Sequence, residues 1–258
     1  MRIDRRQATE TFNAYVRTYD PANPRIALKI AHTWRVAALS ERIAKSIPLD
    51  TDLAWLCGLL HDIGRFEQVR RFDTFNDAAS VPHAALGVSV LFDEDETHDT
   101  APLLRSFVAD DTQDALIRTA IAVHSDFRIP QNLDELTRAY CNVLRDADKI
   151  DIIQVNCTCP IEDVYGVAEA DMIASELSPT VVDAFYEHRT IARQVRVFPA
   201  DILVSHLCFA WELVYPASRT ILGEQGYINQ MLGKHFSNPD TEATFRAMAS
   251  HMREELDL

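Results

Sequence analysis

Apolar residues recur every three or four positions along nearly the whole chain, the spacing that gives a helix one buried face. The alternating pattern typical of a strand is almost absent, and residues 195–198 (Val-Arg-Val-Phe) form the one short candidate. Capping side chains mark the expected helix starts. These starts lie at Asn23-Pro24, Asp50-Thr51, Asp111-Thr112, Ser178-Pro179 and Asn238-Pro239. The pattern predicts an all-α helical bundle of roughly ten to thirteen helices.

Two neighbouring residues interrupt one of the most apolar segments. His61 and Asp62 follow Leu60 and precede Ile63, so both are expected in the protein interior. Moving such groups from water into an apolar site without a partner costs roughly 2–7 kcal/mol, and more for an ionised acid. Because imidazole and carboxylate groups are common metal ligands, a bound cation would hold both of them there.

Four further residues of ligand type lie on apolar helix faces: His32, His83, His124 and Asp148. Each shares its face with Val, Leu or Ile residues three, four or seven positions away, and Pro82 marks the start of the helix that carries His83. A single buried histidine is more often satisfied by a backbone carbonyl, and a single aspartate is more often a helix cap. Six such residues together favour a metal site instead.

The other histidines carry less information. His98, His235 and His251 lie in polar surroundings and are expected to be solvated. His188 and His206 either line a pocket near the metal site or pack in the interior, and packing is the favoured interpretation.

The order and spacing of the ligand-type residues resemble a known signature. The doublet lies within residues 58–64 (Gly-Leu-Leu-His-Asp-Ile-Gly), and Asp148 lies within residues 145–151 (Arg-Asp-Ala-Asp-Lys-Ile-Asp). Together with His32, these segments are similar to the metal-binding signature of the HD superfamily of metal-dependent phosphohydrolases. The similar region runs from about residue 23 to residue 155. The resemblance implies an HD-domain helical bundle with additional C-terminal helices.

The resemblance also extends to a second metal ion. Residues 83–91 and residues 121–124 (Ile-Ala-Val-His) resemble the additional ligand segments of binuclear members, which include cyclic-di-nucleotide phosphodiesterases and di-iron oxygenases. By this resemblance, the first ion is held by His32, His61, Asp62 and Asp148. Asp62 bridges to a second ion, which is held by His83 and His124.

The chemistry of these ligands explains their number. Mixed imidazole and carboxylate ligands suit manganese, iron, nickel, cobalt or zinc, so one or two divalent transition-metal ions are expected and their identity stays open. A carboxylate can bridge two ions about 3.5–4 Å apart, and a water held there becomes a hydroxide that attacks phosphorus. Asn76-Asp77, in the loop before His83, either orients a ligand histidine or forms a turn.

The chain is acidic, with a formal net charge of −14 from 25 Lys and Arg and 39 Asp and Glu. This charge argues against duplex nucleic acid and membrane surfaces as partners. A phosphorylated small molecule needs nearby cations, and by analogy with the family Arg65 and Lys149 join Asp62 as the catalytic candidates. Alternatively, Lys149 pairs with a neighbouring acid, and Arg65 belongs to a solvated cluster with Arg70 and Arg71.

Length and composition suit one large helical domain. A chain of 258 residues with 47% hydrophobic content can bury a sizeable core, and its 7 glycines leave little linker material. We expect a single domain over residues 1–258, with a metal-binding core at about 23–156 and a C-terminal elaboration at about 157–258. The elaboration would form a lid or a dimer face, so a homodimer is compatible with the sequence.

Several features bear on the location of the protein. No apolar run approaches 18 residues, and the first residues lack the apolar segment of a secretion signal, which predicts a cytoplasmic protein. Five cysteines are an odd number and lie mostly in apolar segments, as reduced thiols do. Cys157 and Cys159 could form a redox or metal pair, but structural packing is favoured. Residues 93–99 are acidic and are expected to form a loop.

Three functions fit these observations. The leading one is metal-dependent hydrolysis of a phosphate ester or anhydride of a small molecule, with a nucleotide as the favoured substrate. The second is an HD-fold di-iron oxygenase, because that branch of the family shares the six-ligand set. The third is a non-catalytic, metal-stabilised sensor module, although the completeness of the ligand set favours an enzyme.

Overall fold

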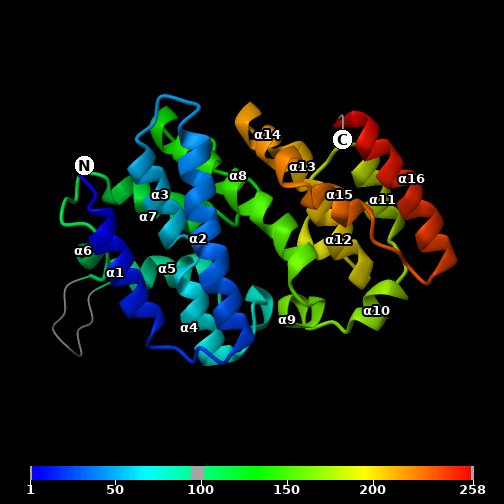
Figure 1. Cartoon of the computed structure of the whole chain (residues 1–258), viewed down its shortest axis with the longest axis horizontal. Coiled ribbons are helices and arrows are strands. Elements are labelled where there is room, and N and C mark those ends of the chain that lie inside the picture. The colour runs from blue at the N-terminus through cyan, green and yellow to red at the C-terminus, as the bar shows by residue number, and fades with distance from the viewer. Residues whose placement is uncertain (1, 94–101, 257–258) are drawn as a thin grey trace. The chain divides into compact units, whose positions relative to one another are not determined.

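The structure is a computed structural model that describes residues 2–93 and 102–256. These residues form helices and connecting loops with no strand among them, so the prediction of an all-α fold is confirmed (Figure 1). The chain divides into two compact units, Met1–Asp148 and Lys149–Leu258. The division falls inside one long helix, close to the expected end of the metal-binding core at about residue 156.

The first unit contains the helices that come earlier in the chain. Among the described residues they are α1 (Arg5–Val16), α2 (Pro24–Ala44), α3 (Thr51–Leu60), α4 (Ile63–Phe72), the 3₁₀ helix η1 (Asp77–Ala79), α5 (His83–Phe92), α6 (Leu104–Phe107), α7 (Asp114–Val123) and the first part of α8 (Glu135–Thr158). Helix α2 packs along α3, α4 packs on α5, and α5 packs on α7. These three pairings bring together the parts of the chain that carry His32, the doublet His61-Asp62, His83 and His124.

Two glycines allow the helices of the first unit to approach closely. A Cβ atom at Gly58 of α3 would lie 2.7 Å from the Cα of Ala37 on α2. A Cβ atom at Gly64 of α4 would lie 2.4 Å from both the Gly87 nitrogen and the His83 carbonyl oxygen on α5. Because real Cβ atoms do not approach backbone this closely, only glycine permits either contact.

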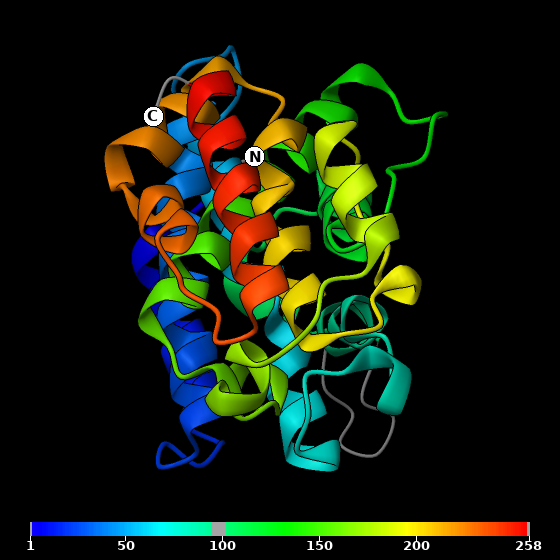
Figure 2. The ribbon, with the colours of Figure 1, turned by 90° about the vertical axis from the view of Figure 1, so that its right-hand side faces the viewer.

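The second unit is built from the later helices. Among the described residues they are the rest of α8, α9 (Ile161–Tyr165), α10 (Glu169–Ile173), α11 (Pro179–Tyr186), the 3₁₀ helix η2 (Arg193–Val195), α12 (Pro199–Leu207), α13 (Phe209–Glu212), α14 (Pro216–Gln225), α15 (Tyr227–Leu232) and α16 (Pro239–Glu255). Figure 2 shows α16 in red. Among the described helices of this unit, α15 packs on α16, and α12 packs on α10, α11 and α13. Phe185, Ile228, Met231 and Phe245 are fully buried in this unit.

The one candidate strand, at residues 195–198, does not form. Val195 ends η2, and the backbone N–H groups of Val197 and Phe198 donate to the carboxylate of Asp201 at 2.8 and 3.0 Å. The buried carboxylate also accepts from the N–H and the hydroxyl of Ser178. One side chain therefore satisfies the backbone groups that a neighbouring strand would otherwise pair.

Most predicted helix starts are confirmed. The side chains of Asn23, Asp50 and Asn238 cap α2, α3 and α16, and α11 follows Ser178. Helix α7 starts two residues after Thr112, because the Thr112 N–H donates to the Asp110 carboxylate in a turn. The described residues contain sixteen α-helices, more than predicted, because five of them have only four to six residues.

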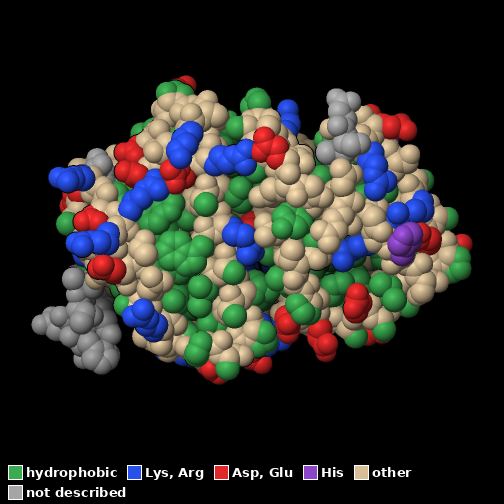
Figure 3. Space-filling view, viewed as in Figure 1, with side chains coloured by type: hydrophobic (Ala, Val, Ile, Leu, Met, Phe, Trp, Pro, Cys, Tyr) green, Lys and Arg blue, Asp and Glu red, His purple; other side chains and the backbone are tan. Residues whose placement is uncertain are grey.

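Other expectations depend on the surface. On the face drawn in Figure 3, Lys and Arg side chains are interspersed with Asp and Glu. No helix within residues 2–93 and 102–256 has the length and hydrophobicity that crossing a bilayer requires. All five cysteines are free thiols. The expected acidic loop after Asp93 and the expected solvation of His98 lie outside the described residues.

Candidate metal centre

The six predicted metal ligands converge within the first unit. Their ligand atoms form three groups, and within each group all the atoms lie within 4.8 Å of one another. The groups are His32, His61 and Asp62; His61, His124 and Asp148; and Asp62, His83 and His124. Each of the four histidines is at most 4% exposed. These buried groups could hold metal ions.

The helix is interrupted between α3 and α4, and this interruption lets the neighbouring side chains of His61 and Asp62 face the same site. His61 follows the last residue of α3 with helical backbone angles, whereas Asp62 leaves the helix at φ −104° and ψ 17°. Helix α4 then starts at Ile63. Adjacent side chains in a continuous helix point about 100° apart. The break between α3 and α4 removes this constraint.

The first subsite consists of His32, His61, Asp148 and the Oδ2 atom of Asp62. The Nε2 atoms of His32 and His61 are 3.2 Å apart, and each is 3.4 Å from Asp62 Oδ2. The Oδ1 atom of Asp148 lies 3.2 Å from His32 Nε2 and 3.7 Å from His61 Nε2. Four side chains from three parts of the chain therefore surround one point.

The second subsite consists of His83, His124 and the Oδ1 atom of Asp62. The Nε2 atoms of the two histidines are 3.0 Å apart, and they lie 3.5 and 3.7 Å from Asp62 Oδ1. Asp62 is thus shared between the subsites, with one carboxylate oxygen facing each of them. This is the arrangement of a bridging carboxylate.

The spacing of the ligand atoms suits a transition-metal ion. Ligands about 2.0–2.2 Å from a common ion lie about 3–3.6 Å apart in octahedral or tetrahedral geometry. The distances between ligand atoms in the two subsites run from 3.0 to 3.7 Å. The donor set of imidazole nitrogens and carboxylate oxygens also suits such ions.

The histidine tautomers support the same conclusion. His61 and His124 direct Nδ1 at the carbonyl oxygens of Gly58 and Ile121, at 2.8 and 2.7 Å. His83 directs Nδ1 at the carboxylate of Asp77, at 2.7 Å. Because these partners only accept hydrogen bonds, the Nδ1 atoms carry the protons and the Nε2 atoms present lone pairs. Two lone pairs 3.0 Å apart, on His83 and His124, call for a cation between them.

Asp77 contacts His83 on the side of the ring that faces away from the second subsite. Its other oxygen accepts hydrogen bonds from Arg65 at 2.8 Å and from the amide of Gln68 at 2.9 Å. Burial by itself raises the pKa of Asp77, but the hydrogen bond from His83 and the charge of Arg65 hold it well below its usual range. Burial and the Arg65 charge lower the pKa of His83 to about 3, so the ring is in the neutral form that binds metals. Of the two alternatives for Asn76-Asp77, Asp77 contacts His83, while the Asn76 side chain accepts from the Ala78 N–H in a turn.

Arg145 fixes the position of the other histidine in the second subsite. Its guanidinium donates to the carbonyl oxygens of Val123, His124 and Asp126, at 3.1, 2.9 and 2.6 Å. These carbonyls lie at the end of α7, where helical partners are missing. Arg145 therefore ties the end of α7 to α8.

The predicted catalytic cations lie in different surroundings. Arg65 is 6% exposed, and besides Asp77 and Gln68 it donates to the carbonyl oxygen of Phe75 at 2.8 Å. Its Nε atom is 3.7 Å from Asp62 Oδ1. In the second unit, Lys149 forms an ion pair with Glu212, the kind of acid pairing considered as its alternative. Contact of Arg65 or Lys149 with a substrate stays a prediction.

Sequence reasoning missed one residue of the site. The Nζ atom of Lys29 on α2 lies 2.6 Å from Asp62 Oδ2. Lys29 stands three residues before His32 and therefore lies on the same helix face, which is the sequence signal that could have pointed to it. Burial alone would raise the pKa of Asp62, but the charge of Lys29 keeps it well below its usual range. The carboxylate is therefore ionised at neutral pH.

Replacing Asp77 by Asn should weaken the second subsite selectively. The amide keeps the shape of the side chain but loses the charge that fixes the His83 tautomer, so affinity for the second ion should fall about 10- to 100-fold. Metal titration followed by elemental analysis would measure this loss. Asp73→Asn is the matched control, since Asp73 is exposed in the same loop and pairs with Arg25. Equal loss of both ions, or of neither, would contradict the assignment.

The remaining described histidines lie in the second unit. His206 is buried and bonded to Asn156 and Tyr165, which confirms packing. His188 stacks on Trp211 with ring centroids 4.3 Å apart, and its Nε2 lies 3.3 Å from His251 Nε2. His235 is exposed, as expected, and bonds to Glu242.

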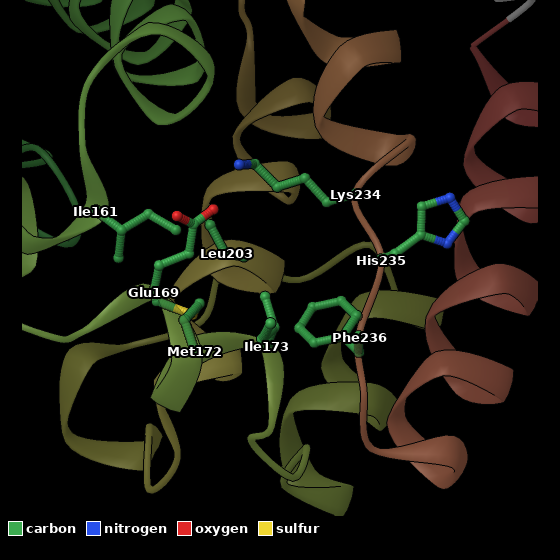
Figure 4. A pocket seen from close by; sticks show the side chains of 8 residues that line it. All are labelled: Ile161, Glu169, Met172, Ile173, Leu203, Lys234, His235 and Phe236. Atoms are coloured by element: carbon green, nitrogen blue, oxygen red, sulfur yellow. The ribbon is translucent and has the colours of Figure 1, made fainter.

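A pocket of about 110 Å³ also lies in the second unit (Figure 4). Five apolar side chains form most of its lining, and the charged ends of Glu169 and Lys234 lie on one side of it. None of the predicted site residues lines this pocket.

The first unit is all-helical among its described residues, and its buried, converging histidines and aspartates could bind metal ions. Residues 30–154 match the family model of the HD domain, and this range contains all six predicted ligands. Residues 30–154 therefore form an HD domain, and this domain is typical of a superfamily of metal-dependent hydrolases. Comparison with curated proteins and comparison with solved structures each gave no match.

Proposed function

We propose that the chain is a metal-dependent phosphohydrolase that uses two ions to cleave a phosphate ester or anhydride of a small molecule. The observation that carries this proposal is the position of Asp62, whose two oxygens face different histidine pairs. A bridging carboxylate of this kind is the usual basis of a two-metal phosphoryl-transfer site. The HD-domain match supports the same class of reaction.

The residues of the site divide the work between them. His32, His61 and Asp148 would hold one ion, His83 and His124 would hold the other, and Asp62 would contribute one oxygen to each subsite. Divalent ions bound there would lower the pKa of water and take up charge on the phosphate oxygens. Buried imidazoles fixed through Nδ1 need little reorganisation when the site is loaded, which keeps the ligands in place during the reaction.

The favoured substrate class is a nucleotide, as many HD-domain proteins act on nucleotides. The formal net charge of −14 supports a small substrate, because a phosphate polymer would meet overall repulsion. Within the site itself, Lys29 and Arg65 supply local positive charge close to Asp62.

The test combines metal analysis with a substrate panel. Protein purified without chelator should contain two transition-metal ions per chain and should release phosphate from at least one nucleotide or phosphomonoester when manganese, iron, nickel or cobalt is supplied. Two irons with oxygen uptake on an organic substrate and no phosphate release would instead identify an oxygenase. Two ions with neither activity would favour a sensor module.

A further inference from the structure

Lys29 is held at the candidate metal centre by charge. Its ammonium lies 2.6 Å from Asp62 Oδ2 and 5.3 Å from the centre of the Phe75 ring. The same oxygen faces the Nε2 atoms of His32 and His61 at 3.4 Å. Lys29 and an ion in the first subsite would therefore share one carboxylate oxygen.

Such sharing weakens the attraction between Lys29 and Asp62. A divalent ion at Oδ2 withdraws charge from the oxygen and repels the ammonium, whose flexible stem allows it to move. An anion that enters the site would offer the ammonium a new partner. Lys29 therefore pairs with the same carboxylate that would hold a metal ion.

Arg65, the other cation beside Asp62, is held much more firmly. Its guanidinium donates to Gln68, to the Phe75 carbonyl and to Asp77 at 2.6 to 2.8 Å. It can therefore stabilise Asp77 and Phe75, but it moves only if this network breaks. Among the described residues, the Lys29 ammonium donates to Asp62 and lies over the Phe75 ring, and these two contacts hold it less firmly than the network around Arg65.

Exposure also distinguishes Lys29. The side chains of Lys29 and Asp148 are 14% and 15% exposed, whereas those of the four ligand histidines are 2% exposed or less. Solvent, and hence a small ligand, can therefore reach the side chains of Lys29 and Asp148. A phosphate group that approaches the first subsite would meet the Lys29 ammonium there.

We propose that Lys29 is a substrate-binding residue that donates to a non-bridging phosphate oxygen once the metals are bound. This inference rests on the proposed function and names the cation that recognises the transferred group. It assigns Arg65 the separate role of positioning Asp77. The class of ligand is a phosphate monoester, an anhydride or free phosphate, which all present the same oxygens.

The test uses the metal-loaded protein and inorganic phosphate as the probe. Equilibrium dialysis with labelled phosphate should give a dissociation constant at least about tenfold higher for Lys29→Gln than for wild type, because a charge-assisted hydrogen bond is lost. Lys29→Arg should restore most of the affinity. Lys45→Gln, at the exposed end of the same helix, should bind phosphate like wild type. Both Lys29 variants should retain two ions per chain.

Three outcomes would overturn the inference. The first is unchanged phosphate binding by Lys29→Gln, and the second is absence of phosphate binding by the wild type. The third is loss of bound metal from Lys29→Gln, which would make Lys29 only a structural partner of Asp62. Failure of the proposed function is seen separately. A wild-type protein that binds phosphate through Lys29 but hydrolyses nothing in the panel would contradict the hydrolase and support the anion site.

Discussion

Replacing Asp62 by Asn should empty both subsites and reduce turnover by about 1,000-fold or more. The neutral amide is a poor ligand, and it cannot bridge two cations as a carboxylate does. Metal ions contribute several kcal/mol to stabilisation of a phosphoryl-transfer transition state, and about 4 kcal/mol corresponds to a 1,000-fold change in rate. Elemental analysis after desalting and kcat/KM on the best substrate of the panel would measure both effects.

The interpretation requires that the variant folds. Asn has nearly the shape of Asp, so circular dichroism and the melting transition should show an intact helical protein, with some loss of stability because Lys29 loses its ionic partner. Asp126→Asn is the control, since this exposed residue lies two positions from His124 and outside both subsites. A folded Asp62→Asn protein with two ions and full turnover would refute the bridging role.

Replacing Gly64 by Ala should destabilise the protein by at least about 3 kcal/mol, the upper range for overpacking a core. The new Cβ would lie 2.4 Å from two backbone atoms of α5 and 2.9 Å from the Cα of Gly87. Backbone cannot rotate away as a flexible side chain can, so α4 and α5 must separate. One of the clashing atoms is the carbonyl oxygen of His83, so the second ion should also be lost. Denaturant unfolding of metal-free protein isolates the packing effect.

Gly223 provides the matched control for this substitution. It lies within α14, and a Cβ atom there would meet nothing within 4 Å. Gly223→Ala should therefore stabilise the protein by about 0.5–1 kcal/mol, because alanine favours the helix. If Gly64→Ala were as stable as wild type, the close contact between α4 and α5 would not contribute to the fold.

The sequence predicts the candidate ligands because burial of each one is a local property. His32 and Asp148 stand in helices whose apolar stripes fix the buried face, so their direction follows from helical periodicity. The clustering of six such residues then follows from the resemblance to a family. The family match over residues 30–154 confirms the HD domain.

The supporting contacts could not be predicted in the same way. Lys29 meets Asp62 across 33 residues of chain, and Arg145 meets the end of α7 across about 20 residues. Such pairs depend on how helices pack, which no local pattern records. Lys29 in particular resembles any surface lysine of an amphipathic helix until α3 and α4 are placed beside it.

The strand expected at residues 195–198 shows the converse limit. Val195 and Val197 favour extended backbone, but the local preference does not reveal which group satisfies the backbone N–H donors. Here the buried Asp201 carboxylate accepts them. Local capping of α12 by Asp201 therefore takes the place of strand pairing.

The division of Asp62 between the two subsites bears on how such proteins diversify. The second subsite takes one oxygen from the first and adds only His83 and His124, which stand on α5 and at the end of α7. Two substitutions on these helices would convert a binuclear ancestor into a mononuclear descendant while leaving the four ligands of the first subsite intact. The number of bound metal ions can thus change during evolution while the helical fold is kept. Proteins that share this fold can therefore differ in their chemistry.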